Sequence, residues 1–253
     1  MKKALSIAGF DPSGWAGVLA DAAAFRDFGL MGFSAVTSLT AQDFSSVKGV
    51  APVEPAFLKK ELSVILDCFE IDAVKTGMLA TSANVRTVAR VLKKAGIKNV
   101  VVDPVMRSTG GRALLTEDGV KTLIKNLVPL SSIVTPNIEE ASVISGVRIK
   151  GVADMEEAAE KIFCLGPGSV LIKGGHLEGT PVDILYDGKD FCYFKGRRIK
   201  GPKEAFHGTG CVLSSALASG LALGKTLKSA VDDAKRYTEG VIAGRKSMLR
   251  KKR

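Results

Sequence analysis

The sequence predicts an α/β fold in which helices cover both faces of a mostly parallel central sheet. Short apolar runs alternate with longer helical patterns along most of the 253 residues. Most of these runs are continuously apolar, which is typical of strands buried on both faces. The strand–helix order favours parallel pairing through helical crossovers. The chain is 46% hydrophobic and 25% charged, which is typical of globular proteins and argues against disorder, collagen and coiled coils.

Each predicted element follows from its local pattern. The apolar runs predict strands at 4–8, 33–39, 71–74, 100–102, 133–134 and 170–172. Helical patterns lie near 15–28, 55–69, 81–95, 117–127, 138–145, 154–165, 209–223 and 227–248. Around 181–200 the pattern becomes a hairpin that turns at Asp187–Gly188. The sequence has no repeat of fixed period and no proline-rich linker, so we predict one domain over 1–253.

The net charge of +10 is concentrated at one place. Residues 245–253 hold six basic residues and no acid, so the rest of the chain is closer to balance. A basic terminal segment is usually solvated, and we predict a frayed tail there. With 1 Trp, 3 Tyr and 11 Phe and no RNA-stacking motif, the sequence gives no support for a nucleic-acid partner.

The four cysteines are far apart, which argues against a disulfide framework and a structural zinc site. The N-terminus reaches Asp11 too soon for the apolar segment of a signal peptide. No apolar run approaches the ~18 residues that a membrane-spanning helix needs. We therefore expect a cytoplasmic protein with no membrane partner.

Polar and glycine-rich segments occur at the junctions where predicted strands end and helices begin. In parallel sheets this edge binds ligands, because helix N-termini meet there. The junctions read GFDPSGWAG (9–17), TAQD (40–43), KTGM (75–78), DPVMRSTGG (103–111), TPNIEE (135–140), KGGH (173–176) and HGTGC (207–211). This concentration predicts a ligand site.

The 207–211 junction precedes a helix rich in small apolar residues. The amides of Gly208, Thr209 and Gly210 would form an anion hole at its N-terminus. Cys211 would lie in the first turn, where the helix dipole lowers a thiol's pKa and favours the thiolate. The alternative is an ordinary buried cysteine behind a helix cap.

Four further junction residues suggest phosphate or metal chemistry. Asn137 and Glu140 either cap a helix or serve a magnesium site together with Asp103, since Mg²⁺ prefers carboxylate and amide oxygens. Lys173, beside two glycines, either contacts phosphate or extends to solvent.

Asp21 lies on an otherwise apolar helix stripe, so it is either exposed at the edge or buried with a partner or ligand. Gln42 offers the paired donor and acceptor that suit a nitrogen heterocycle.

Taken in order, seven segments resemble the hydroxymethylpyrimidine/phosphomethylpyrimidine kinases of thiamine biosynthesis, within the ribokinase-like superfamily. They are ALSIAGFDPSGWAG, TSLTAQD, DAVKTGML, VVDPVM, TPNIEEA, VLIKGGHLEG and HGTGCVLSSALA, spanning residues 4–218. The resemblance implies a three-layer α/β/α fold. It also implies ATP- and Mg²⁺-dependent phosphorylation of 4-amino-5-hydroxymethyl-2-methylpyrimidine and of its monophosphate, often by a homodimer.

The resemblance also implies residue roles. The pyrimidine pocket would be lined by Gly9, Asp21, Gln42, Met78 and Val105. Asp103 and Glu140 would serve the metal, and ATP would contact Lys173, Asn137 and Thr209. The catalytic set would be the anion hole of Gly208, Thr209 and Gly210, with Cys211 as general base.

The chain departs from the family pattern at three places. Trp15 stands where a second glycine is usual, and Phe10 replaces a small hydroxyl residue. The loop 105–115 lacks the common Lys-Ser-Gly-Asp and contains Arg112 instead. Two alternatives therefore stay open: a pyridoxal or pyridoxine kinase of the same superfamily, and a non-catalytic nucleotide- or metabolite-binding protein.

Overall fold

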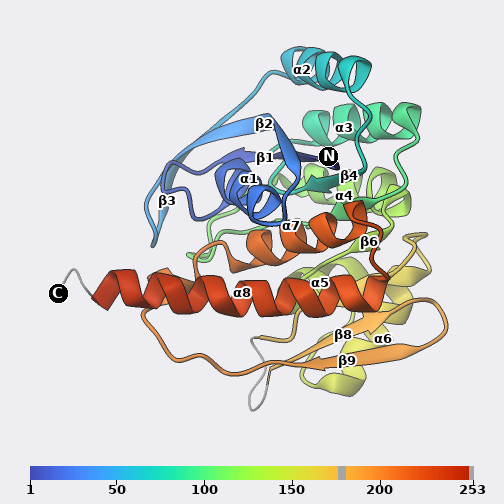
Figure 1. The fold of residues 1–253 in the computed structure, drawn as a ribbon. Helices are drawn as coiled ribbons and strands as arrows, with labels where there is room; N and C mark the ends of the chain where they lie inside the picture. The colour runs from blue at the N-terminus through green and yellow to red at the C-terminus, as the bar shows by residue number, and fades with distance from the viewer. Residues whose placement is uncertain (176–180, 251–253) are drawn as a thin grey trace.

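The fold is organised by one sheet, seen here in a computed structural model that describes residues 1–175 and 181–250. The strand order is β3-β2-β1-β4-β5-β6-β7-β8-β9 within this part of the chain (Figure 1). The strands are β1 Lys3–Phe10, β2 Met31–Gln42, β3 Val47–Pro52, β4 Ala73–Thr76, β5 Val100–Val102, β6 Ile133–Val134, β7 Val170–Ile172, β8 Val182–Tyr186 and β9 Phe191–Lys195.

The middle of the sheet is parallel and its two edges are antiparallel. Strands β2, β1, β4, β5, β6 and β7 pair in parallel, whereas β3, β8 and β9 pair antiparallel to their neighbours. The mostly parallel sheet predicted from the sequence is confirmed. Because the central strands share one direction, their carboxyl ends meet along one edge of the sheet.

Helices cover both faces, so the predicted three-layer α/β/α architecture is also confirmed. One face carries α2 Pro55–Cys68, α3 Ser82–Ala95, α4 Glu117–Asn126, α5 Ile138–Ser145 and α6 Val152–Phe163. The other carries α1 Gly17–Asp27, α7 Thr209–Ala222 and α8 Leu227–Arg250. Alternate strand residues supply the two cores: Val100 and Val102 pack under the first group, and Val101 packs under the second.

Strands β5, β6 and β7 and helix α5 occupy the residues predicted for them. The hairpin of β8 and β9 is also present, and Gly188 has the left-handed φ of +92° that its turn needs. Strand β4 lies two residues later than predicted, at Ala73–Thr76, because it includes a lysine that interrupts the apolar run. The sequence analysis missed β3, whose short VKGVAP segment contains glycine and proline.

The C-terminal region differs from the prediction. Residues 245–250 belong to helix α8, which runs from Leu227 to Arg250, and the Arg245 side chain is buried. The frayed tail was therefore wrong for these residues, because Arg245 is held by hydrogen bonds to backbone carbonyls. Residues 251–253 lie outside the described part. None of the helices described is both long enough and apolar enough to cross a membrane.

Candidate active site

The predicted site residues gather at one edge of the sheet, at or just after the carboxyl ends of the parallel strands. Helix α7 directs its N-terminus to the same edge, where Gly210 approaches Lys173. The strands contribute Gly9 from β1, Gln42 from β2, Met78 after β4, Asp103 and Val105 after β5, Asn137 after β6 and Lys173 after β7. The topology thus brings together residues that are far apart in the sequence.

Gly9 and Met78 form one wall of this edge. A Cβ added to Gly9 would lie 3.1 Å from Met78 Sδ and 3.0 Å from Ser38 Oγ. The Ser38 hydroxyl also points to Met78 Sδ, at 3.6 Å. Gln42, half-buried, hydrogen-bonds Asp11. A larger residue than glycine at position 9 would displace the methionine, so Gly9 keeps this wall open.

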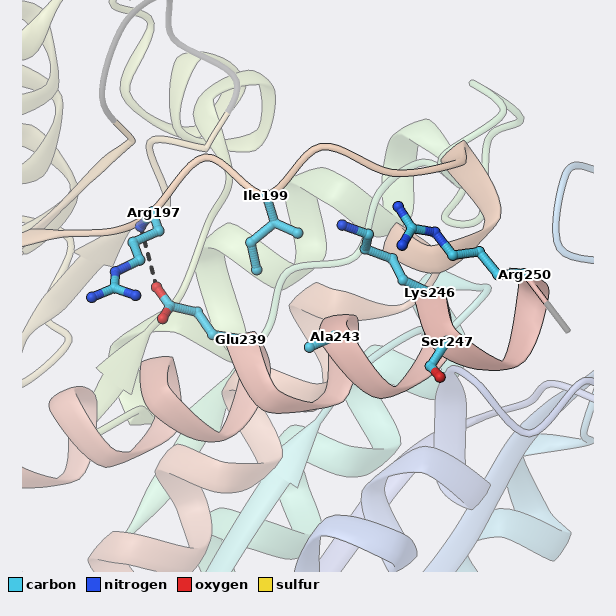
Figure 2. Close-up of a pocket in the computed structure, with 7 residues that line it drawn as sticks. All are labelled: Arg197, Ile199, Glu239, Ala243, Lys246, Ser247 and Arg250. Atoms are coloured by element: carbon cyan, nitrogen blue, oxygen red, sulfur yellow. Dashed lines mark hydrogen bonds between the residues drawn. The ribbon is translucent and has the colours of Figure 1, made fainter.

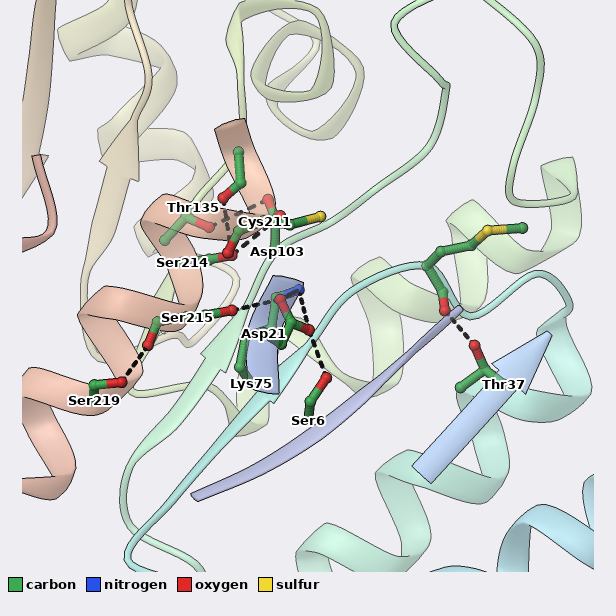
Figure 3. Close-up of polar contacts among 12 residues, drawn as sticks. Ser6, Asp21, Thr37, Lys75, Asp103, Thr135, Cys211, Ser214, Ser215 and Ser219 are labelled. Carbon is green, nitrogen blue, oxygen red and sulfur yellow. Dashed lines mark hydrogen bonds and ion pairs between the residues drawn. The ribbon is translucent and has the colours of Figure 1, made fainter. Parts of the chain in front are cut away.

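Asp21 is buried and ion-paired with a lysine of the central sheet. Its side chain has no exposed surface, and its carboxylate lies 2.8 Å from Lys75 Nζ (Figure 3). The hydroxyls of Ser6 and Ser215 donate to the same carboxylate. The other possibility raised by the sequence, an acid buried with a partner, is the arrangement observed. The sequence analysis missed Lys75, although a lysine inside a buried strand was a signal for it.

Asp103 and Lys173 form a second ion pair, at 2.8 Å. Thr135 and Ser214 place their hydroxyls 3.4 and 3.3 Å from the Asp103 carboxylate. A Cβ on Gly210 would lie 3.3 Å from Lys173 Nζ, so this pair adjoins the first turn of α7. Although burial lowers the pKa of Lys173, the negative charges of Asp103 and Glu140 raise it on balance. Lys173 is therefore a cation at the anion-binding end of a helix.

Asn137 and Glu140 cap helix α5 by a reciprocal pair of hydrogen bonds. The Glu140 amide donates to Asn137 Oδ1, and the Asn137 amide donates to Glu140 Oε2, both at 2.9 Å. The helix-cap alternative is thus present in the structure. Glu140 is buried, which raises its pKa to about 7; Lys173 acts to lower it and Asp103 to raise it.

The carboxylates of this site suit a magnesium ion that is bound jointly by the protein and by the phosphates of a substrate. Within the described residues, no group of three or more His, Cys, Asp or Glu side chains gathers to hold a metal ion. Asp103 and Glu140 supply two carboxylates around Lys173. Mg²⁺ is commonly bound by one or two carboxylates together with waters and substrate phosphates. The residues therefore fit a nucleotide-bound magnesium ion and do not fit a cage built from protein alone.

The start of α7 is built around a glycine that no larger residue could replace. Gly208 is the residue before the helix and has a left-handed φ of +69°. A Cβ there would lie 2.1 Å from the Trp15 carbonyl oxygen, so only glycine fits. Thr209 and Gly210 begin the helix, where the first amides have no partners within the helix itself.

Cys211 lies in the first turn of α7, but the predicted lowering of its pKa was wrong. Burial raises the pKa of the Cys211 thiol, and the carboxylates of Asp21 and Asp103 add to this effect. The Lys75 ammonium and a hydrogen bond with the Gly17 backbone oppose it without overcoming it. The dipole of α7 is a local effect that the sequence reveals. Burial and the carboxylates of Asp21 and Asp103 come from other elements of the fold, and together they outweigh it.

A cluster that the sequence analysis did not recognise adjoins this helix start. His207 Nε2 lies 2.8 Å from Asp11 Oδ2. Burial acts to raise the pKa of Asp11, but hydrogen bonds from His207 and Ser13 hold it at about 2. Arg245 donates to the carbonyls of His207 and Trp15, and its guanidinium lies 4.7 Å from the Trp15 ring centre. No local pattern predicted that these residues meet.

The divergent loop 105–115 packs against the other side of the site. Arg112 donates to the carbonyls of Val47 and Lys48, at 2.9 and 2.8 Å. A Cβ on Gly110 would lie 2.8 Å from the Ser45 carbonyl oxygen. The loop is thereby fastened to β3 and the segment before it.

A groove of about 420 Å³ runs between residues 197–199 and the outer face of α8 (Figure 2). Ile199 and Ala243 give it apolar walls, and Glu239 accepts a hydrogen bond from the Arg197 amide. None of the predicted site residues lines it. The segment beyond Ile199 continues through the short helix η2 Lys203–Phe206 into His207 and Gly208.

The chain matches a known protein family over nearly its whole length. The family model that describes phosphomethylpyrimidine kinase matches residues 11–252. The chain belongs to the phosphomethylpyrimidine kinase family. It is 43% identical to the hydroxymethylpyrimidine/phosphomethylpyrimidine kinase of Aquifex aeolicus, over 97% of this chain and 96% of that protein. It spans 45% and 48% of the length of two curated relatives that are named as bifunctional proteins of thiamine biosynthesis, from Oryza sativa and Geobacter sulfurreducens.

Two solved structures are similar throughout. The phosphomethylpyrimidine kinase of Clostridium difficile 630 is 40% identical with a TM-score of 0.86, over 96% of this chain and all of that one. An ADP complex of Bacillus subtilis pyridoxal kinase is 38% identical with the same TM-score, over 93% of this chain and 89% of that one. As a member of the phosphomethylpyrimidine kinase family, the chain is a small-molecule kinase, and its predicted ribokinase-like fold is confirmed.

Proposed function

We propose that this kinase uses ATP and Mg²⁺ to phosphorylate 4-amino-5-hydroxymethyl-2-methylpyrimidine and then its monophosphate. The observation that supports it best is the meeting of the Asp103–Lys173 ion pair with Gly210 and Cys211 at the start of α7. A cation, an anion-binding helix start and a candidate base then surround one point. Phosphoryl transfer needs this combination, because its catalysis rests on positioning and charge stabilisation.

In the proposed reaction, the alcohol lies between the Gly9–Met78 wall and Cys211. The Cys211 thiolate accepts the hydroxyl proton and becomes the thiol, as the alcohol oxygen bonds to the γ-phosphorus and the bond to the ADP oxygen breaks. The amides of Gly208, Thr209 and Gly210 donate to the phosphoryl oxygens during transfer. Lys173, with Asn137, would hold the ATP phosphates by charge and hydrogen bonding.

Magnesium would neutralise phosphate charge, and Asp103 and Glu140 are the residues that would hold it. Gln42 and Val105 would complete the pyrimidine pocket beside Gly9 and Met78. We propose an indirect role for Asp21, which would support the pocket through its buried ion pair with Lys75.

The groove beside α8 would take the nucleoside of ATP. Its apolar walls at Ile199 and Ala243 suit the faces of a purine ring, and its volume is ample for one. The chain from this groove leads through η2 to Gly208.

Steady-state kinetics with a panel of alcohols tests the proposal. We expect kcat/KM for the hydroxymethylpyrimidine and its monophosphate to exceed the value for pyridoxal and pyridoxine. The likeness to Bacillus subtilis pyridoxal kinase favours pyridoxal as the second candidate substrate, and the reverse preference would establish it. Turnover of no alcohol would favour a nucleotide- or metabolite-binding protein instead.

We further propose that residues 1–253 act as one kinase domain, as a homodimer in the cytoplasm. Sedimentation velocity of the purified protein distinguishes a monomer from a dimer.

A further inference from the structure

Arg245 lies within the segment that the sequence predicted to be a solvated tail, yet it is only 7% exposed. Its guanidinium donates to the carbonyl of His207, the residue immediately before Gly208. It also donates to the carbonyl of Trp15, at 2.8 Å. We infer that Arg245 is a positioning residue for phosphoryl transfer, which fixes the peptide that leads into the anion hole. This inference rests on the proposed function.

The geometry of the peptide unit connects Arg245 to the anion hole. In a trans peptide the C=O and N–H groups point in opposite directions, and the described residues, His207 and Gly208 among them, contain no cis peptide bond. Since the His207 carbonyl points to Arg245, the Gly208 N–H points away from it. Loss of the guanidinium would free this peptide to rotate, and the amides that follow would lose their alignment.

The second contact of Arg245 is with a residue that also packs against Gly208. The Trp15 carbonyl packs against Gly208 so closely that a Cβ there would lie 2.1 Å from its oxygen. Because Arg245 binds both this carbonyl and that of His207, it joins the loop after β1 to the start of α7. Gly208 lies next to both of the carbonyl groups that Arg245 binds.

Side chains reinforce this clamp, which consists of Asp11, Trp15, His207 and Arg245. The His207 ring bonds to the Asp11 carboxylate, which also accepts hydrogen bonds from Ser13. The Trp15 ring lies 4.7 Å beneath the Arg245 guanidinium, within the range of a cation–π contact. His207 is thus held at its ring and at its carbonyl by two different elements.

The clamp uses a residue that departs from the family pattern. Trp15 stands where the early loop usually has a second glycine, and glycine would offer Arg245 a carbonyl but no ring. The pairing of Trp15 with Arg245 predicts that substitution of the tryptophan ring weakens the same function more mildly than substitution of the arginine.

The test compares Arg245→Met with Arg236→Met, an exposed arginine on the same helix whose partners are surface aspartates. For Arg245→Met we expect kcat to fall roughly 10- to 100-fold, the range for misplaced reacting groups, with KM for the alcohol changed less than about threefold. Trp15→Phe should lower kcat less. Guanidinium at non-denaturing concentration should restore part of the kcat of Arg245→Ala.

A kcat within twofold of wild type, with only a lower melting temperature, would show that Arg245 merely stabilises the fold. Should Arg245→Met fail to fold, Arg245→Lys keeps the charge but offers one nitrogen for two carbonyls. Unchanged kcat in that variant would overturn the inference, and a several-fold loss with normal melting would support it. If wild type and Arg236→Met turn over no alcohol at all, the proposed function fails instead.

Discussion

Asp21 and Lys75 form an ion pair in which neither side chain has any exposed surface, with Lys75 Nζ 2.8 Å from Asp21 Oδ2. Helix α1 supplies the acid and the central strand β4 supplies the lysine. The attraction of Asp21 raises the pKa of Lys75 despite its burial. Each of the two charges therefore stabilises the other in the interior of the protein.

Replacing one member alone should destabilise the protein strongly. Lys75→Met leaves the Asp21 carboxylate buried without its cation, which costs about 3–5 kcal/mol. The double variant Asp21→Asn with Lys75→Met should recover much of this loss. Urea unfolding of the three proteins measures the effect, and a loss below ~1 kcal/mol in the single variant would contradict the prediction.

Asp11 should contribute stability that depends on pH. Its pKa is about 2 in the folded protein against an ordinary value of 3.8, so folding favours the ionised form. The contribution is present above the unfolded value and is lost as pH falls through about 2. Asp11→Asn should thus cost about 2 kcal/mol at pH 7, and the gap from wild type should narrow between pH 4 and pH 2.

Urea titrations at several pH values test this, with Asp67→Asn at the exposed end of α2 as the control. A gap that stays constant down to pH 2 would mean that the Asp11 charge is not what stabilises the loop.

Cys211→Ala should fold and lose kcat by roughly 10²–10⁴, the usual effect of removing a general base. Because burial raises the pKa of Cys211, wild-type kcat should still be rising above pH 9. The charged groups that act on this thiol are Asp21, Lys75, Asp103, Lys173 and Arg245. The pH–rate profile is the measurement. A Cys211→Ala variant of near-normal kcat would remove the base role and leave the other contacts standing.

Arg112 should control the loop that it fastens to β3. Arg112→Met removes two hydrogen bonds to the carbonyls of Val47 and Lys48. We expect KM for the alcohol to rise about three- to tenfold, which corresponds to ~1 kcal/mol, the net value of a hydrogen bond or two. Amide hydrogen exchange should increase in residues 107–113 and 43–48. Unaltered exchange in both segments would show that the loop is held by other contacts.

Ala243→Trp should obstruct the groove beside α8. Since Ala243 forms an apolar wall, an indole there would occupy the space proposed for a purine. KM for ATP should rise at least tenfold, while KM for the alcohol should remain close to wild type. Ala243→Ser is the matched control. Equal KM values for ATP in all three proteins would place the nucleoside elsewhere.

The sequence predicted the fold well wherever local pattern determines structure. The apolar runs at β5, β6 and β7 are strands because burial on both faces leaves no room for polar residues. Strand β4 was displaced because Lys75 appeared to end it, although Asp21 makes that lysine a core residue. A charged residue inside an apolar pattern signals a buried partner, but the local sequence does not identify a partner 54 residues away.

Local sequence also predicted some parts of the site and missed others, because it does not show which distant segments meet in the folded chain. Glycines 208 and 210 could be recognised because a helix start next to small residues is a local feature. The raised pKa of Cys211 and the burial of Arg245 could not, since both depend on elements that meet only in the folded chain.

The contact between Trp15 and Arg245 joins positions separated by 230 residues. During synthesis the loop after β1 leaves the ribosome early and α8 leaves it late. The contact between them can therefore form only after most of the chain has been made. Contacts of such long sequence separation form slowly, because a large loop must close first. The nascent protein can therefore assemble its sheet while the phosphate-binding turn is still loose. Catalytic competence becomes one of the last properties that this molecule acquires during its synthesis.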